Sequence, residues 1–341
     1  MEDKTRTFLL NFGVTMKRIL FISALLLCCF SGIQARDLGQ FHRGQDSLTF
    51  IYEPLADKPI TLYYYIPTTG DVRKMPVLFS FHGAERSGLN PIICWREFAE
   101  RDGFIVLSPQ FRRDLYDENQ YQFGNVFKTR ECKELNPEEE WIYSAVEPMF
   151  SFFKKETGNR ARKYDIQGHS AGGQFVHRYL LAKPGAKVRK AVASNPGSWS
   201  WISDDGSING RTVEAKWPYT IKGTPFDDAK HVKAYLARNM VVHNGDVDTA
   251  AHGPNVPDVP AAKAEGANRF ERGKNYFAAM QEYAKGKGWK FNWKAVTVHG
   301  IGHQGRGMVY GIFTKDSSGK NQYDLTKYSK TGAYTLIYEQ P

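Results

Sequence analysis

The chain has 341 residues, of which 41% are hydrophobic, 24% charged and 14% aromatic. These proportions are those of ordinary globular proteins, and they exclude a disordered, collagen-like or coiled-coil chain. Lys and Arg outnumber Asp and Glu by 46 to 36, a formal charge of +10, but no basic run is longer than two residues. We therefore expect a mildly cationic surface that could attract anionic polymers, and no nucleic-acid partner, because nucleic-acid binding needs clustered positive charge.

The beginning of the sequence has the pattern of a secretory signal peptide. Lys17 and Arg18 precede an apolar run over 19–30, and small residues follow. A transmembrane helix needs about 20 apolar residues, so this run is too short for a stable anchor. We expect residues 1–35 to be removed on export to the periplasm or the outside of the cell, with Met16 as an alternative start.

Residues 36–341 are expected to form a single domain without stable membrane insertion. They keep two cysteines, Cys94 and Cys132. In an exported protein such a pair can form a disulfide, and two free buried thiols are the equally weighted alternative. The sequence has no CxxC or HExxH motif, so we expect no metal site and no cofactor.

From residue 48 onward the sequence alternates between predicted strands and helices. Two β-rich runs, 48–52 and 60–66, are separated by turn residues and predict an opening antiparallel hairpin. Alternating strands and helices after it imply a mostly parallel sheet covered by helices on both faces. The later strands are predicted at 76–81, 104–107, 163–167, 190–194, 239–243 and 291–298, and the helices around 92–99 and at 136–153, 172–182, 227–238 and 268–285.

Two segments of this series carry more specific predictions. Asn136-Pro137 followed by three glutamates predicts a helix start, with an Asn cap, Pro at the first position and acids at the positive end of the helix dipole. Residues 198–226 are predicted to be an irregular insertion that could arch over a site. Its Trp199 and Trp201 are equally compatible with a substrate-stacking platform and with core packing.

The strongest chemical motif is Gly168-His169-Ser170-Ala171-Gly172, a G-x-S-x-G sequence between a predicted strand and a predicted helix. That context is typical of a nucleophile elbow, in which the serine hydroxyl stands on a strained turn at a helix N-terminus. The positive end of the helix dipole would also favour a developing oxyanion there. We therefore predict Ser170 as a nucleophile.

A nucleophilic serine needs a base and an orienting acid, which in this architecture follow it in the order acid, then histidine. His303 comes a few residues after the last predicted strand in a glycine-rich loop, and His299 is its competitor. The acid is predicted from Asn244-Gly245-Asp246-Val247-Asp248, directly after the preceding strand. Asp248 is favoured over Asp246 because the loop needs some length beyond the strand, and an ordinary acidic turn is the alternative.

The oxyanion hole of such a site needs two backbone N–H groups directed at the developing charge. One is expected from Ala171, next to the nucleophile. The other is expected from Ala84, because His82-Gly83 follows the strand at 76–81 and glycine lets the backbone approach closely.

Together, the segments FHGAERSG, DGFIVLSPQ, GHSAGG, NGDVDT and GIGH resemble the α/β-hydrolase superfamily. The branch they resemble most is that of secreted polyhydroxybutyrate depolymerase-like and feruloyl or acetyl-xylan esterase-like enzymes. The likeness runs from Pro76 to His303. It implies Ser170 as nucleophile, Asp248 as acid and His303 as base, with oxyanion amides at Ala84 and Ala171.

The function expected from motif and resemblance is that of a secreted serine hydrolase. It would cleave carboxylic esters through an acyl-enzyme. The expected substrates are small-molecule or polymeric esters, in particular ester groups of polysaccharides or of polyesters. The long charged loop after residue 108 departs from the family's usual substrate-loop patterns. A serine peptidase of the same fold and a non-catalytic glycan-binding protein are the alternatives.

Overall fold

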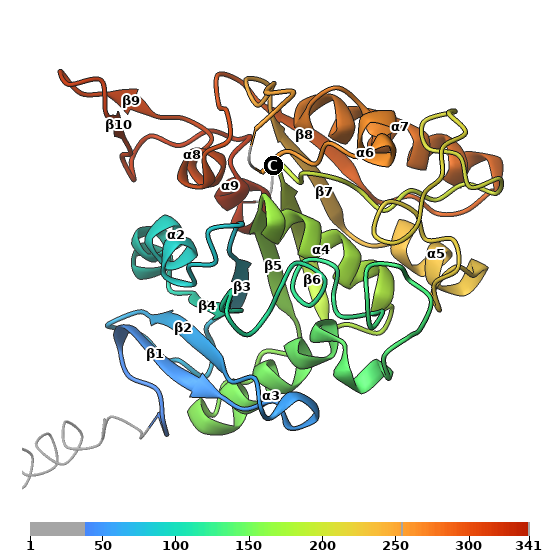
Figure 1. Cartoon of the computed structure of the whole chain (residues 1–341). Helices are drawn as coiled ribbons and strands as arrows, with labels where there is room; N and C mark the ends of the chain where they lie inside the picture. Colours follow the sequence, from blue (N-terminus) through green and yellow to red (C-terminus); the bar gives the residue numbers. More distant parts are fainter. Residues whose placement is uncertain (1–37, 254, 340–341) are drawn as a thin grey trace, which may run out of the picture. The chain divides into compact units, whose positions relative to one another are not determined.

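An eight-stranded sheet runs through the structure, a computed structural model that describes residues 38–253 and 255–339 (Figure 1). Its strand order is β1-β2-β4-β3-β5-β6-β7-β8. β1 pairs with β2 and β2 with β4 in antiparallel fashion, and all further neighbours are parallel. The predicted opening hairpin and mostly parallel sheet are confirmed. The strands are β1 (Gly44–Phe50), β2 (Ile60–Ile66), β3 (Val77–Phe81), β4 (Ile105–Gln110), β5 (Tyr164–His169), β6 (Val188–Ser194), β7 (Met240–Gly245) and β8 (Lys294–Val298).

Helices cover both faces of the sheet, because side chains of the central strands alternate between two apolar layers. On β3, Leu78 packs into a cluster with α2 and α9, whereas Phe79 and Phe81 contact α3 and α4 through Phe150 and Phe175. The helices are α2 (Leu89–Asp102), α3 (Val146–Thr157), α4 (Ala171–Ala182), α5 (Ala229–Leu236), α6 (Pro260–Glu265), α7 (Arg269–Gly286), α8 (Gly305–Tyr310) and α9 (Ala333–Tyr338).

The helix predicted to start at Asn136 begins later. Residues Glu138–Glu140 and Ile142–Ala145 form two 3₁₀ turns, and α3 starts only at Val146. Between the turns Trp141 is extended, with φ −67° and ψ 133°. Its ring is buried against Phe226 and its indole N–H donates to the carbonyl of Asn136, so tertiary packing of Trp141 overrides the local helix-start signal.

The segment that follows β8 returns to the sheet. Helices α8 and α9 pack against α2, and between them a short hairpin of β9 (Thr314–Lys315) and β10 (Asn321–Gln322) projects outward in Figure 1. The sequence analysis assigned no elements to this region. Short helices and two-residue strands leave too little periodicity to detect.

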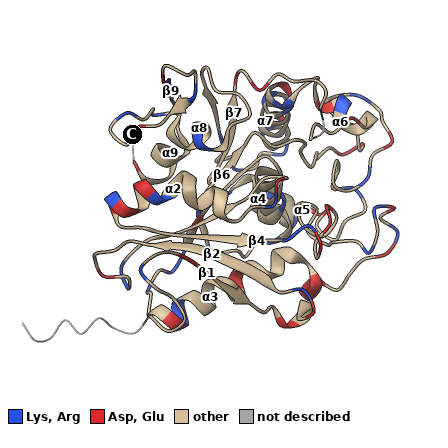
Figure 2. Cartoon of the chain, turned by 60° about the vertical axis from the view of Figure 1, so that its left-hand side comes forward, with Lys and Arg blue, Asp and Glu red and all other residues tan. Residues whose placement is uncertain are grey.

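Charged residues lie mainly on the helices and loops, with Lys and Arg interspersed among Asp and Glu (Figure 2). Within the described ranges, no helix is long and apolar enough to cross a membrane. The predicted signal peptide, residues 1–35, lies outside the described residues.

The parallel part of the sheet determines where functional residues can meet. Strands β3, β5, β6, β7 and β8 run in the same direction, so their carboxyl ends meet at one edge. The loop after β3 carries Ala84, and Ser170 follows β5. Asp248 follows β7 and His303 follows β8, so the fold gathers all four predicted residues at this edge.

Candidate active site

Ser170 occupies a sharp turn between β5 and α4. Its φ is 59° and its ψ −118°, which is unusual for a residue with a side chain and is typical of strained functional positions. The turn needs small neighbours on both sides. A Cβ on Gly168 would lie 2.2 Å from the carbonyl oxygen of Gly172, and one on Gly172 would lie 2.2 Å from the carbonyl oxygen of Phe81.

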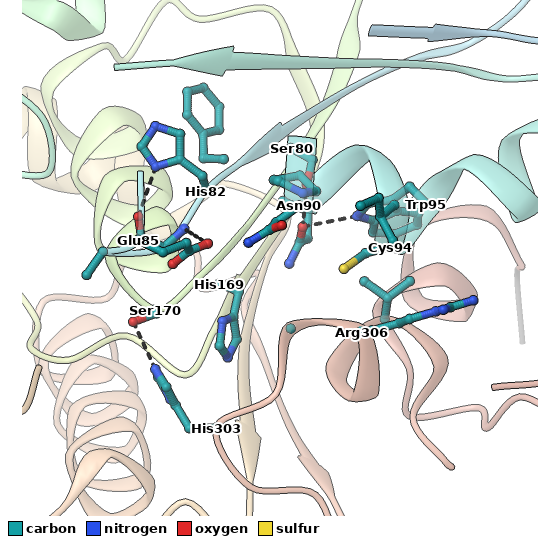
Figure 3. A pocket seen from close by; sticks show the side chains of 18 of the residues that line it. Ser80, His82, Glu85, Asn90, Cys94, Trp95, His169, Ser170, His303 and Arg306 are labelled. Atoms are coloured by element: carbon teal, nitrogen blue, oxygen red, sulfur yellow. Dashed lines mark hydrogen bonds between the residues drawn. The ribbon is translucent and has the colours of Figure 1, made fainter. Parts of the chain in front are cut away.

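A continuous hydrogen-bonded chain joins Ser170, His303 and Asp248 (Figure 3 shows its first link). The Nε2 atom of His303 lies 2.9 Å from the Oγ atom of Ser170, and its Nδ1 atom lies 2.6 Å from Oδ2 of Asp248. An ionised carboxylate can only accept, so Nδ1 carries the hydrogen and Nε2 presents its lone pair to the serine hydroxyl. This arrangement can remove a proton from Ser170.

The competing aspartate and histidine form a separate pair. Asp246 accepts from the N–H of Gly300 at 2.8 Å and pairs with Nδ1 of His299 at 2.8 Å. The His299 side chain is 83% exposed, whereas the Asp248 side chain is only 2% exposed. Asp246 and His299 therefore form a hydrogen-bonded pair at the surface of the loop, whereas the buried Asp248 reaches Ser170 through His303.

The sequence analysis did not identify the cation that binds Asp248 at the end of this hydrogen-bonded series. Arg269, the first residue of α7, donates from Nη1 to Oδ1 of Asp248 at 3.1 Å and from Nη2 to the carbonyl of Asn255 at 2.8 Å. Both side chains of the pair are almost completely buried. One signal was present in the sequence. A basic residue in the first turn of a helix is unfavourable, because it lies at the positive end of the helix dipole. Such a residue indicates that an acidic side chain nearby offsets this repulsion.

Asn195, which follows β6, joins the loops of the acid and the base. Its side-chain oxygen accepts from the N–H of Gly245 at 2.8 Å, and its Nδ2 donates to the carbonyl of Gly302 at 3.1 Å. The residue adopts a positive φ of 46°. It therefore holds the end of β7 beside the residue that precedes His303.

The two predicted oxyanion donors lie at the same edge. Ala171 is the first residue of α4, where a backbone N–H has no intrahelical partner. Ala84 belongs to residues 82–86, here called the HG loop, and its N–H has no hydrogen-bond partner within the described part of the chain. Ala84 and Ser170 both line each of the two cavities at the site.

The larger cavity has a volume of about 480 Å³ and the smaller about 170 Å³. His303 lines the larger one together with His169, whose ring centroid lies 4.5 Å from that of His303 (Figure 3). Burial lowers the pKa of His169 well below its usual value, so this imidazole is neutral beside the base. Ala171 lines the smaller cavity with Gln122, Phe123 and Arg130 from the long loop after β4.

Many solved structures are similar to the chain, and two of them are about 30% identical to it. The poly(aspartic acid) hydrolase-1 from Sphingomonas sp. KT-1 is 30% identical, with a TM-score of 0.71, and the match covers 78% of this chain and 96% of that one. LpqC, a poly(3-hydroxybutyrate) depolymerase from Bordetella parapertussis, is 29% identical, with a TM-score of 0.69 and coverage of 78% and 86%. The chain belongs to the α/β-hydrolase superfamily, in its polyhydroxybutyrate depolymerase-like branch. No protein-family model and no curated protein matches the chain.

Trp199 and Trp201 of this α/β-hydrolase do not form a platform beside Ser170. Trp199 and Trp201 are 0% and 2% exposed, and neither lines the two cavities at the site. Trp199 stacks on Tyr276 of α7 with ring centroids 4.6 Å apart, and Trp201 meets the same ring edge-on. The substrate-platform prediction is wrong, because these side chains attach the insertion to the core.

Cys94 and Cys132, the two cysteines within the described residues, are free thiols, so the possible disulfide between them is not formed. Cys94 lies on α2 and lines the larger cavity, and burial raises its pKa to about 12. Cys132 lies in the loop after β4, where its thiol donates to the carbonyl of Trp217 at 3.3 Å. The alternative of two free thiols is the one that the structure has.

Proposed function

We propose that this α/β-hydrolase is a serine esterase in which Ser170 is the nucleophile, His303 the base and Asp248 the orienting acid. The hydrogen-bonded chain from Asp248 through His303 to Ser170 carries the proposal. The strained turn at Ser170 supports it, and so do the N–H groups of Ala84 and Ala171, which have no hydrogen-bond partner among the described residues. The substrates are carboxylic esters, on polyesters or polysaccharides.

The reaction follows from the positions of the atoms. The Nε2 atom of His303 takes the hydroxyl proton of Ser170 while Oγ forms a bond to the ester carbonyl carbon. The carbonyl oxygen becomes an oxyanion that accepts hydrogen bonds from the N–H groups of Ala84 and Ala171. When the tetrahedral adduct collapses, the carbon–oxygen bond to the alcohol breaks and His303 gives its proton to the leaving oxygen.

The acyl-enzyme is then hydrolysed by the same groups. His303 takes a proton from water, the resulting hydroxide attacks the acyl carbon, and Ser170 leaves with that proton as the acid is released. Asp248 keeps the imidazole in one tautomer and stabilises its cation in both half-reactions.

A polymeric substrate is supported by one of the similar structures, whose own name is that of a poly(3-hydroxybutyrate) depolymerase. Export to the periplasm or beyond is supported by the signal-peptide pattern of residues 1–35.

Hydrolysis of p-nitrophenyl acetate and butyrate by residues 36–341 tests the proposal, with Ser170→Ala beside the wild type. We expect Ser170→Ala to lower kcat by roughly 10⁴-fold or more, because the nucleophile of a triad acts as a unit with its base. Unchanged hydrolysis in Ser170→Ala would refute the role of the serine. Cleavage of peptide p-nitroanilides without ester hydrolysis would favour the peptidase alternative.

A further inference from the structure

Several backbone groups of the HG loop, residues 82–86, are hydrogen-bonded on both sides of the N–H of Ala84. The N–H of Gly83 donates to the carboxylate of Glu85 at 3.2 Å, and the N–H of Arg86 donates to the carbonyl of Gly83 at 3.2 Å. The carbonyl of Ala84 accepts a hydrogen bond from the guanidinium of Arg113. The N–H of Ala84, which has no hydrogen-bond partner in the described part of the chain, thus lies between a carbonyl and an N–H of the loop that are both held.

His82 ties the HG loop to the segment after β4. The N–H of Phe111 donates to Nε2 of His82 at 3.1 Å, so the ring hydrogen is on Nδ1, which donates to the carbonyl of Gly83 at 2.9 Å (Figure 3). Burial lowers the pKa of His82 to about 3, so this neutral tautomer persists at ordinary pH. One imidazole therefore joins two loops.

Arg86 makes the same connection with a buried charge. Its guanidinium donates to the carbonyls of Phe111, Tyr116 and Asp117 at 3.1–3.2 Å, and the residue is 5% exposed. Its φ is 61°, a conformation that costs a side-chain-bearing residue about 1–3 kcal/mol unless its surroundings impose it. The three carbonyls provide those surroundings.

Tyr121 completes the connection from the other loop. Its hydroxyl donates to the carbonyl of His82 at 2.7 Å. Its ring centroid lies 4.4 Å from that of the imidazole and 4.5 Å from the guanidinium carbon of Arg86. The ring is fully buried and contacts the rings of Phe111 and Phe175. Tyr121, from the long loop after β4, therefore holds the carbonyl of His82, two residues before Ala84.

We propose that Tyr121 and Arg86 are positioning residues for the reaction. They clamp the HG loop to the segment after β4, so that the N–H of Ala84 is already oriented before substrate binds. Preorganised donors stabilise an oxyanion most because they need no rearrangement during the reaction. This role rests on the proposed function, in which Ala84 is an oxyanion donor.

The test compares Tyr121→Phe with the wild type. This variant removes one hydroxyl and keeps the ring stacking. We expect kcat/KM for p-nitrophenyl butyrate to fall about five- to thirtyfold, less than the hundredfold or more that loss of a whole oxyanion donor causes. KM should stay within about twofold. The affinity for butylboronic acid, which forms a tetrahedral adduct with the serine, should fall in parallel with kcat/KM.

Tyr143→Phe is the matched control. Tyr143 is equally buried, contacts the same ring of Phe175, and donates to the carbonyl of Gln122 rather than to the HG loop. Its kcat/KM and boronic acid affinity should stay within about twofold of the wild type, even if its melting temperature falls as much as that of Tyr121→Phe. Arg86→Lys keeps the charge but loses the three-carbonyl bridge, and we expect a larger loss of kcat/KM than in Tyr121→Phe.

The two proposals fail in different ways. Hydrolysis by Ser170→Ala at the wild-type rate would overturn the serine esterase itself. An inactive Ser170→Ala together with Tyr121→Phe at wild-type kcat/KM and boronic acid affinity would overturn only the clamp. Equal losses in Tyr121→Phe and Tyr143→Phe would do the same, because they would reflect general core damage.

Discussion

The buried pair of Arg269 and Asp248 makes a quantitative prediction about stability. Their side chains are 5% and 2% exposed, and the Nη1–Oδ1 distance is 3.1 Å. Arg269→Met would leave the Asp248 carboxylate buried with the imidazole of His303 as its one remaining side-chain partner in the described structure. Removal of one member of such a pair typically costs about 3–5 kcal/mol, because the remaining charge loses its compensation in a poorly solvating environment.

A double-mutant cycle separates this interaction from lost packing. Arg269→Met, Asp248→Asn and the double variant are unfolded in urea, and the free energy of unfolding is obtained by linear extrapolation. We expect the double variant to lose at least about 1.5 kcal/mol less than the sum of the single losses, since the second change removes the charge that the first left unpaired.

The exposed pair of Arg112 and Asp114 is the control. Its side chains are 50% and 60% exposed, so Arg112→Met should change the free energy of unfolding by less than about 1 kcal/mol. Losses at Arg269 and Asp248 that add to within about 0.5 kcal/mol would refute the reasoning, because independent sites add in this way.

Three further predictions concern other parts of the structure. Asp246→Asn should leave kcat/KM within about twofold, whereas Asp248→Asn should lower kcat about 10⁴-fold; equal losses would contradict the assignment of the acid. Trp199→Ala should lower the free energy of unfolding by about 3–5 kcal/mol without raising KM. A raised KM at unchanged stability would instead support a role of Trp199 in substrate binding. Burial lowers the pKa of His82 to about 3 and of His243 to about 4, below the 6.5 of an unfolded chain. The contribution of these two histidines to the free energy of unfolding should therefore be fully present above pH 6.5. It should fall on acidification by about 1.4 kcal/mol per pH unit for each histidine, and equal urea midpoints at pH 7 and pH 5 would disprove this.

Much of the fold could be predicted because strand periodicity and helix capping are local. Asn268 caps α7 as its sequence position suggests, and its side chain accepts from the N–H of Glu271. The order of the motifs after successive strands was enough to bring Ser170, Asp248 and His303 to one edge, since parallel strands end together. The order of these residues along the chain was therefore sufficient to predict that they lie close together in space.

The predictions that were wrong concern residues whose structure depends on contacts with residues distant in sequence. The helix start at Asn136 was a sound local signal, but the packing of Trp141 against Phe226 prevails. The role of Trp199 depends on Tyr276, which lies on a helix far along the chain. Tyr121 could not be recognised, because an aromatic residue in a long loop has no pattern that points to the carbonyl of His82.

The contact between Gly172 and β3 has a consequence for how the site can change. Ala171 directly precedes Gly172, and Ala84 follows Phe81 by three residues, so the backbone contact at Gly172 sets the gap between the two N–H groups. A single methyl group there would wedge α4 away from β3 and widen the gap without touching substrate. The loops on both sides can diverge in sequence and in the substrates they admit, as long as this position carries no side chain.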